Sequence, residues 1–209
     1  MQGAETVFSL IILVFSVISH EVAHGYAAYW FGDKTAYFAG RLTLNPLRHI
    51  DPLGTVIFPL LSYLSFGFLA GWAKPVPYNP FLLKNRYWGE IVVSSAGILT
   101  NVVIGIIFAV FLRNSDFFSF SSASQTILFD IVIINIFLAA FNVLPFPPFD
   151  GLRIIFAIFP RATAGLSRYM DENHLAFIVL SIFIASYVFK YLLPAIYWFV
   201  SLLTGVSFN

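Results

Sequence analysis

The five residues 20–24, His-Glu-Val-Ala-His, combine the residue types and the spacing of a zinc site. On a helix, side chains four residues apart lie on one face, so His20 and His24 can present two imidazoles to one metal ion. Glu21 lies about 100° further round the helix, where its carboxylate can reach a metal-bound water without being a third equal ligand. Zinc lowers the pKa of its water to about 7, and a carboxylate can take the proton as the water attacks a carbonyl. The motif therefore predicts hydrolytic chemistry.

The motif lies inside a long apolar segment, residues 6–31, which is the first candidate membrane span. A helix needs about 20 apolar residues to cross a bilayer, and this segment is long enough. Charged side chains at bilayer depth cost about 2.5–3.5 kcal/mol on insertion scales, so His20, Glu21 and His24 are functional candidates. The alternative is that they hydrogen-bond neighbouring helices. The pattern and the apolar setting together favour the metal site.

The composition excludes an ordinary water-soluble protein. The 209 residues are 59% hydrophobic, 19% aromatic and only 10% charged, whereas a globular chain carries about 25% charged residues. The net charge of +1 argues against nucleic acid as a partner, and the absence of cysteine excludes disulfides and thiolate metal ligands. We predict an all-α polytopic membrane protein with a single domain over residues 1–209, in the cell membrane of a prokaryote.

Hydropathy predicts five or six transmembrane segments. After the first span, the candidates are residues 52–73, 91–112, 126–144 and 175–208. The last stretch is too long for one simple span, and Lys190 and Pro194 interrupt it, so it is one kinked helix or two short ones. A short helix is expected over residues 152–159.

Two connecting segments have features of their own. Residues 36–45 are rich in strand-forming side chains, which predicts a short strand-like hairpin that could pair with an unwound substrate. Residues 71–80 contain three prolines beside Trp72, Lys74 and Tyr78, which predicts a re-entrant or interfacial loop that holds or gates the substrate.

A catalytic zinc takes three protein ligands and leaves one position open. The third ligand must be another histidine or a carboxylate near the membrane, and the candidates are His49, Asp51, Glu90, Asp130, Asp150 and His174. Asp150 follows a proline-broken helix, where the chain can bend inward. Its local sequence alone favours a helix N-cap or an Asp-Gly turn over a metal ligand, so the residues by themselves do not assign the third ligand.

Three segments, in order along the chain, resemble the site-2 protease family of intramembrane zinc metalloproteases. HEVAH matches the first motif, and residues 142–151, NVLPFPPFDG, are similar to the family's N-x-x-P-x-x-x-x-D-G segment. Residues 95–101, SAGILTN, are similar to S-A-G-x-x-x-N, with Ile98 where many members have proline. The resemblance covers residues 5–160 and is to the compact branch without regulatory domains.

The resemblance implies that Asp150 is the third ligand of one Zn²⁺ per chain. It also singles out Asn142 and Asn101, whose carboxamides are expected to donate to the scissile carbonyl or the substrate backbone. The alternative for each is an interhelical hydrogen bond, worth about 0.6 kcal/mol in a membrane. The implied function is regulated intramembrane proteolysis, in which transmembrane proteins are the substrates and lipids the surroundings.

Two other functions stay open on the sequence. A metal-ion transporter or channel also places histidine and acidic side chains in its spans, and a membrane metallohydrolase acting on lipid would use the same local chemistry. A homo-oligomer or a regulatory partner is compatible with the small size of the chain.

Overall fold

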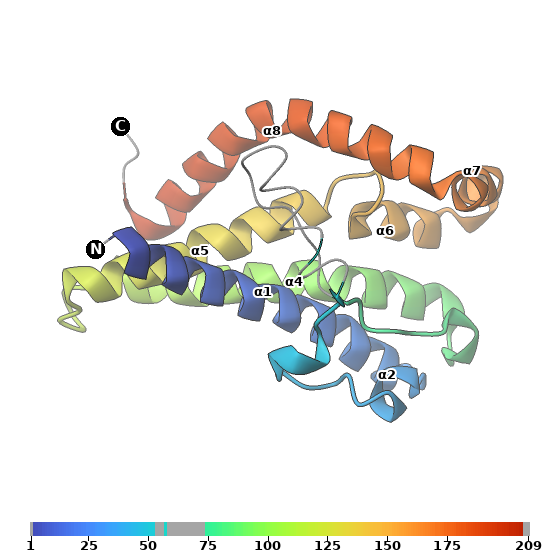
Figure 1. Cartoon of the computed structure of the whole chain (residues 1–209), viewed down its shortest axis with the longest axis horizontal. Helices are drawn as coiled ribbons and strands as arrows, with labels where there is room; N and C mark the ends of the chain where they lie inside the picture. The colour runs from blue at the N-terminus through green and yellow to red at the C-terminus, as the bar shows by residue number, and fades with distance from the viewer. Residues whose placement is uncertain (1, 53–56, 58–73, 207–209) are drawn as a thin grey trace.

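The computed structural model describes residues 2–52, 57 and 74–206, which form helices joined by short loops (Figure 1). Within these residues there are seven α-helices and no strand. Four helical stretches are long and apolar enough to cross a membrane: Thr6–Trp30, Arg86–Arg113, Ser122–Asn142 and Tyr187–Thr204. The all-helical class is therefore confirmed for the described residues, and the predicted spans at residues 6–31, 91–112 and 126–144 correspond to three of these candidate spans. The predicted span at residues 52–73 lies almost wholly outside the described residues.

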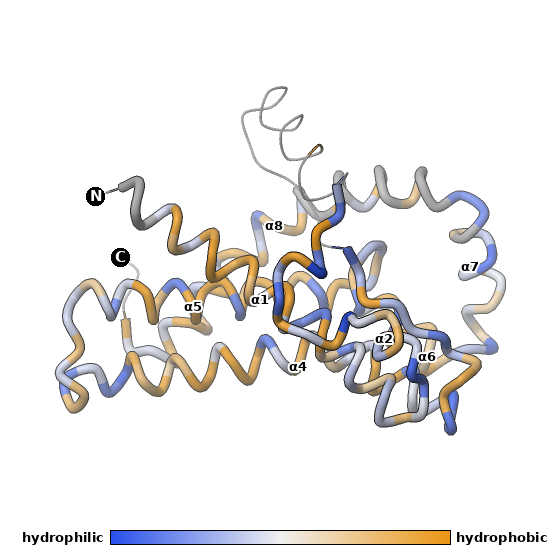
Figure 2. The backbone as a smooth tube through the Cα atoms, turned by 60° about the horizontal axis from the view of Figure 1, so that its bottom comes forward, coloured by the Kyte–Doolittle hydropathy of each residue, from blue (hydrophilic) through white to orange (hydrophobic). Residues whose placement is uncertain are grey.

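Helices α1 (Gln2–Trp30), α4 (Arg86–Arg113) and α5 (Ser122–Asn142) form the centre of the molecule. All three are hydrophobic along most of their length (Figure 2). Helix α4 packs against α1, α5, the short helix α6 (Asp150–Ile158) and the last helix, α8 (His174–Thr204). It begins where the Asn85 side chain accepts a hydrogen bond from the backbone N–H of Trp88, which satisfies one free donor of the first turn. These three helices form the central layer on which the candidate functional residues are positioned.

Helix α8 (His174–Thr204) is one continuous helix with Pro194 inside it, and it arches over α4 and α5 in Figure 1. Of the two arrangements expected for this stretch, the single helix is correct. A proline removes one backbone hydrogen bond and bends a helix, and packing on both sides of the bend can keep the helix intact. Helix α8 contributes to an apolar core that it shares with α4 and α5, made of Ala109, Val132, Ile136, Ile196 and Val200.

Two polar pairs connect α1 and α5 within this apolar layer. The Ser9 hydroxyl donates to Oδ2 of Asp130 at 2.6 Å. Further along α1, the Asn135 amide donates to the Ser16 hydroxyl at 2.9 Å, and both of these side chains are buried. Polar groups in an apolar environment are costly unless they are paired, so these contacts hold α1 and α5 together.

The prediction of a strand-like hairpin at residues 36–45 is wrong. The segment begins with a short helix, α2 (Thr35–Phe38), and leads through turns to a 3-10 helix, η1 (Pro46–Arg48). The Asp33 carboxylate accepts hydrogen bonds from the backbone N–H and the hydroxyl of Thr35, which starts a helical turn. No partner strand lies among the described residues, so local capping outweighs the strand propensity of the side chains.

The described part of the predicted loop, the segment 74–79, runs along the end of α1. It begins where the backbone N–H of Lys74 donates to the carbonyl of His49 at 2.9 Å. It ends where the N–H of Asn79 donates to the Asp33 carboxylate at 2.6 Å, just before the 3-10 helix η3 (Pro80–Leu82). The loop is thus fastened to the α1 end of the molecule by its backbone.

After α5 the chain turns back through its proline-rich segment into α6. The helix predicted at residues 152–159 is thus present and begins two residues earlier, at Asp150. The turn is tight, because a Cβ on Gly151 would lie 2.0 Å from the carbonyl oxygen of Val143. Helix α7 (Pro160–Glu172), which the sequence did not predict, follows directly and leads into α8. The tight turn places the first residue of α6 against the middle of α1.

Candidate metal centre

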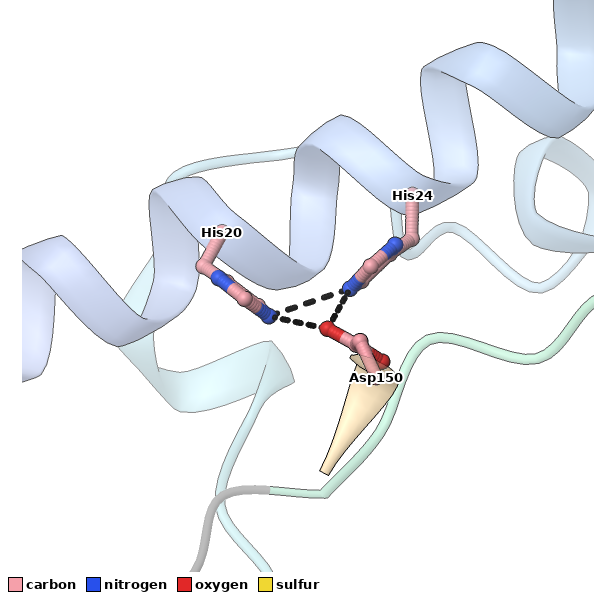
Figure 3. A group of neighbouring side chains, drawn as sticks. All are labelled: His20, His24 and Asp150. Atoms are coloured by element: carbon pink, nitrogen blue, oxygen red, sulfur yellow. Dashed lines mark hydrogen bonds and ion pairs between the residues drawn. The ribbon is translucent and has the colours of Figure 1, made fainter. Parts of the chain in front are cut away.

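Three side chains from two distant parts of the chain converge on one point. His20 and His24 lie one turn apart on α1, and Asp150 is the first residue of α6; all three are buried. The Oδ2 atom of Asp150 is 2.9 Å from Nε2 of His20 and 3.1 Å from Nε2 of His24. The two Nε2 atoms are 3.0 Å apart, and Figure 3 shows that all three ligand atoms face one another. Among the described residues, this is the group of His, Asp and Glu side chains close enough to hold a metal ion.

The other nitrogen of each imidazole is occupied. Nδ1 of His24 donates to the carbonyl of Val93 at 2.6 Å, and Nδ1 of His20 to Oδ1 of Asn101 at 3.0 Å. A carbonyl can only accept, so the proton of a neutral imidazole sits on Nδ1 and the lone pair on Nε2. Both lone pairs then point at the Asp150 carboxylate. Such contacts orient the histidines in metal sites and fix their tautomers.

The charge state of Asp150 completes the argument for a cation. Burial raises the pKa of its carboxyl group, but hydrogen bonds from His20 and His24, when their Nε2 atoms carry protons, lower the pKa by more, and it ends well below its usual range. The carboxylate is therefore ionised at neutral pH. Three electron-rich atoms about 3 Å apart need a positive charge between them, either protons or a metal ion. Two imidazole nitrogens and one carboxylate oxygen are a donor set that zinc takes in catalytic sites.

Gly97 on α4 makes room for the His20 ring. A Cβ at this position would lie 2.5 Å from both Cε1 and Nε2 of His20, closer than side-chain atoms approach one another. A glycine at this position therefore lets α1 and α4 approach closely.

Glu21 is not part of the three-atom group. Its Oε2 accepts a hydrogen bond from the backbone N–H of Val76 at 2.9 Å, so the segment 74–79 orients the carboxylate. Arg41 in turn holds that segment, because its guanidinium donates to the carbonyls of Lys74, at 2.6 Å, and Pro75, at 3.3 Å. Burial lowers the pKa of the Arg41 guanidinium, and the negative charge of Glu21 opposes this shift. No local sequence signal pointed to Arg41 or Val76, because both contacts are tertiary.

The two asparagines lie in different settings. Asn101 is fully buried and contacts His20, and its Nδ2 has no hydrogen-bond partner among the described residues. Asn142 is half-buried at the end of α5 and donates to the carbonyl of Leu138 in its own helix at 2.9 Å. Their expected roles toward a substrate therefore stay predictions.

Three of the other candidate ligands are engaged elsewhere. Nε2 of His49 is 2.8 Å from the carbonyl of Thr43, Glu90 pairs with Arg86 at 2.8 Å, and Asp130 accepts from Ser9. Asp51 and His174 do not belong to the metal-like group either. The geometry favours Asp150 among the six candidates.

Replacing Asn101 by alanine is expected to lower zinc affinity by about 10–100-fold, the range found for partners of metal-bound histidines. The His20 ring would lose the acceptor that orients it. Competition with a chromophoric chelator measures the affinity. The matched control is Asn114→Ala, an exposed asparagine at the end of α4 that bonds only its own helix. Unchanged affinity in the Asn101 variant would show that the contact with His20 is dispensable.

The proteins to which this chain is similar are described as zinc metalloproteases. The sequence profile described as Peptidase family M50 matches residues 8–123 and 115–187. A candidate zinc metalloprotease of Bacillus subtilis, YwhC, is 38% identical over 180 residues, which are 83% of this chain and 79% of the relative. A candidate zinc metalloprotease of Mycolicibacterium smegmatis, Rip2, is 26% identical over 216 residues, covering 96% of this chain and 76% of the relative.

The similarity extends to an archaeon. The zinc metalloprotease MJ0392 of Methanocaldococcus jannaschii is 27% identical over 148 residues, which are 71% of this chain but only 33% of that longer protein. No solved structure matches the fold.

Proposed function

Because this chain belongs to peptidase family M50, the zinc metalloproteases, we propose that it is an intramembrane endopeptidase that hydrolyses peptide bonds in or near transmembrane segments of other membrane proteins. The observation that carries the proposal is the buried convergence of His20, His24 and Asp150 beside helices long enough to cross a membrane. Helix α1, which carries His20 and His24, is one of these helices, so the metal site would lie within the membrane. On this proposal, residues 1–209 act as one domain in a prokaryotic cell membrane, with transmembrane proteins as substrates.

His20, His24 and Asp150 would hold the zinc ion. When bound there, zinc supplies a Lewis acid that makes water nucleophilic at neutral pH and polarises a carbonyl. The protein's own contribution is to keep both imidazoles in one tautomer, through Val93 and Asn101, and to keep the carboxylate ionised. These contacts fix the positions of the ligands before substrate arrives.

Glu21 is proposed as the general base. Its carboxylate takes a proton from the attacking water while the new C–O bond forms, and it returns a proton to the amine nitrogen as the C–N bond breaks. Val76 donates to Oε2 and so restrains the carboxylate, and Oε1 is proposed to take the proton. A base held in this way does not need to reorganise during the reaction.

Asn101 and Asn142 are proposed to bind the substrate. Nδ2 of Asn101 is a buried donor without a partner among the described residues, as a group that donates to a substrate carbonyl would be. Asn142 lies at the end of α5, before the turn that leads to Asp150. A transmembrane helix hides its carbonyls in backbone hydrogen bonds, so a substrate must unwind locally before either asparagine can reach it.

Removal of zinc is expected to abolish cleavage of a labelled transmembrane peptide by the purified protein, and addition of one equivalent of zinc to restore it. The reason is that both the water and the carbonyl depend on the metal for activation. Mass spectrometry of the products and metal analysis of the protein give the two readouts. A zinc-loaded protein that cleaves no transmembrane peptide, but passes metal ions into liposomes, would instead be a transporter.

A further inference from the structure

A hollow of about 410 Å³ opens beside the segment 74–79 and the loop that contains η1. Three of its lining residues are cationic: Arg41, Arg48 and Lys74. Leu47 and Ile50 form an apolar part of its wall and are largely exposed. We call this feature the basic hollow. The volume of the basic hollow is large enough for one side chain of a bound peptide and the residues adjacent to it.

Two of the three cations of the basic hollow have no countercharge among the described residues, whereas Arg41 lies near the Glu21 carboxylate. The described lining residues include no carboxylate, and Arg48 and Lys74 form no ion pair within the described part of the chain. Arg41 is only 7% exposed, and its Nε donor has no partner among the described residues. A buried donor without a partner costs free energy, and an anion in the hollow would supply both the partner and the countercharge.

The basic hollow and Glu21 share one structural element. Lys74 and Pro75 line the hollow, and their carbonyls accept from Arg41. The next residue, Val76, donates its backbone N–H to Glu21. A peptide that reaches Glu21 therefore passes within a few residues of the cationic wall.

The link to Glu21 favours a peptide over a lipid headgroup, because a peptide held for cleavage at Glu21 must lie beside the segment 74–79, which lines the basic hollow. The exposed apolar wall, with Leu47 at 74% exposure, suits the hydrophobic residues of a transmembrane segment.

We propose that the basic hollow is a specificity pocket that binds an aspartate or glutamate side chain of the substrate, a few residues from the scissile bond. The inference rests on the proposed protease function and adds a substrate class to it: transmembrane segments with an acidic residue close to the cleavage site. An acidic side chain in or near a transmembrane segment is costly to bury, and the cationic side chains of the basic hollow offer it a countercharge.

The test uses labelled transmembrane peptides that differ at one position. Glutamate, glutamine or lysine is placed in turn at each position within four residues of the cleavage site, and kcat and KM are measured in phosphatidylcholine nanodiscs. We expect KM to be about 3- to 10-fold lower for glutamate than for glutamine, at positions on one side of the scissile bond, as for a partly solvated charge pair. Equal KM values at every position would overturn the proposal.

The variant is Arg48→Glu combined with Lys74→Glu. Both side chains are exposed and form no ion pair with any described residue, so the fold is spared, whereas a change at buried Arg41 could release the segment 74–79. We expect the preference to reverse from glutamate to lysine in this variant. The matched control is Arg161→Glu combined with Arg168→Glu on exposed positions of α7, with the same change in charge. A similar reversal in the control would show that the preference follows the net charge of the protein and not a local pocket.

Binding of the same peptides to the Glu21→Gln variant, followed by fluorescence anisotropy, separates this proposal from the protease function. If no peptide is cleaved by the wild type, the protease proposal fails, yet tighter binding of the glutamate peptides would still support the basic hollow. If the double variant loses affinity only for phosphatidylglycerol nanodiscs, the hollow binds a lipid headgroup and the peptide proposal is wrong.

Discussion

Replacing Glu21 by glutamine is expected to lower kcat for peptide hydrolysis by about 10²–10⁴-fold, the contribution of a general acid–base group. Glutamine keeps the shape of the side chain and can still accept the hydrogen bond from Val76, but it cannot take a proton from water. Zinc should stay bound, because Glu21 does not belong to the group formed by His20, His24 and Asp150. The expected result is thus a full complement of zinc with little cleavage.

Zinc content by mass spectrometry and cleavage of a labelled transmembrane peptide are the two measurements. Glu90→Gln is the matched control, because Glu90 forms an exposed pair with Arg86 on α4 and should have near wild-type activity. Activity above a tenth of wild type in the Glu21 variant would rule out the general-base role. Loss of zinc from that variant would mean that Glu21 supports the metal instead.

Replacing Gly97 by alanine is expected to lower zinc affinity by about 100-fold or more, although the residue is no ligand. The new methyl group would lie 2.5 Å from the His20 ring, while ordinary contact begins near 3.4 Å. The ring must therefore move by nearly 1 Å, whereas metal–ligand distances tolerate only about 0.2 Å. The ring cannot move freely either, since Asn101 holds its Nδ1.

The control for this variant is Gly165→Ala. A Cβ at Gly165 on α7 meets no atom within 4 Å, so this change adds a methyl group to a helix without a collision. Zinc affinity from chelator competition, with circular dichroism to verify folding, gives the comparison. A Gly97 variant that binds zinc as the wild type does would show that α1 and α4 can move apart at low cost.

The membrane-spanning helices were predictable because a long apolar run is a strong signal. The span at residues 91–112 lies inside α4, and that at residues 126–144 ends two residues beyond α5. Asp150 was different, since its local sequence favoured a helix start or a turn over a metal ligand. Only the resemblance to a known family pointed to it as a ligand, and the structure shows the tight turn at Gly151 that brings it to the histidines.

Other features depend on contacts that no local pattern encodes. The aromatic and β-branched residues of 36–45 predicted strands, but Asp33 begins a helix there by bonding Thr35. The link from Arg41 to the segment 74–79 and on to Glu21 joins residues more than 30 positions apart. Such contacts arise only once α1 and its neighbouring loops are packed together.

The two polar pairs between α1 and α5 fix the axial register of these helices. Ser9 and Ser16, which bond Asp130 and Asn135, lie seven residues apart on α1. A slip of one residue, about 1.5 Å, would part both pairs in an environment without water to replace them. His20 follows Ser16 by one turn, and Asp150 follows α5 after its turn. The axial position at which the proposed ligands meet is therefore set by hydrogen bonds that lie outside the metal site.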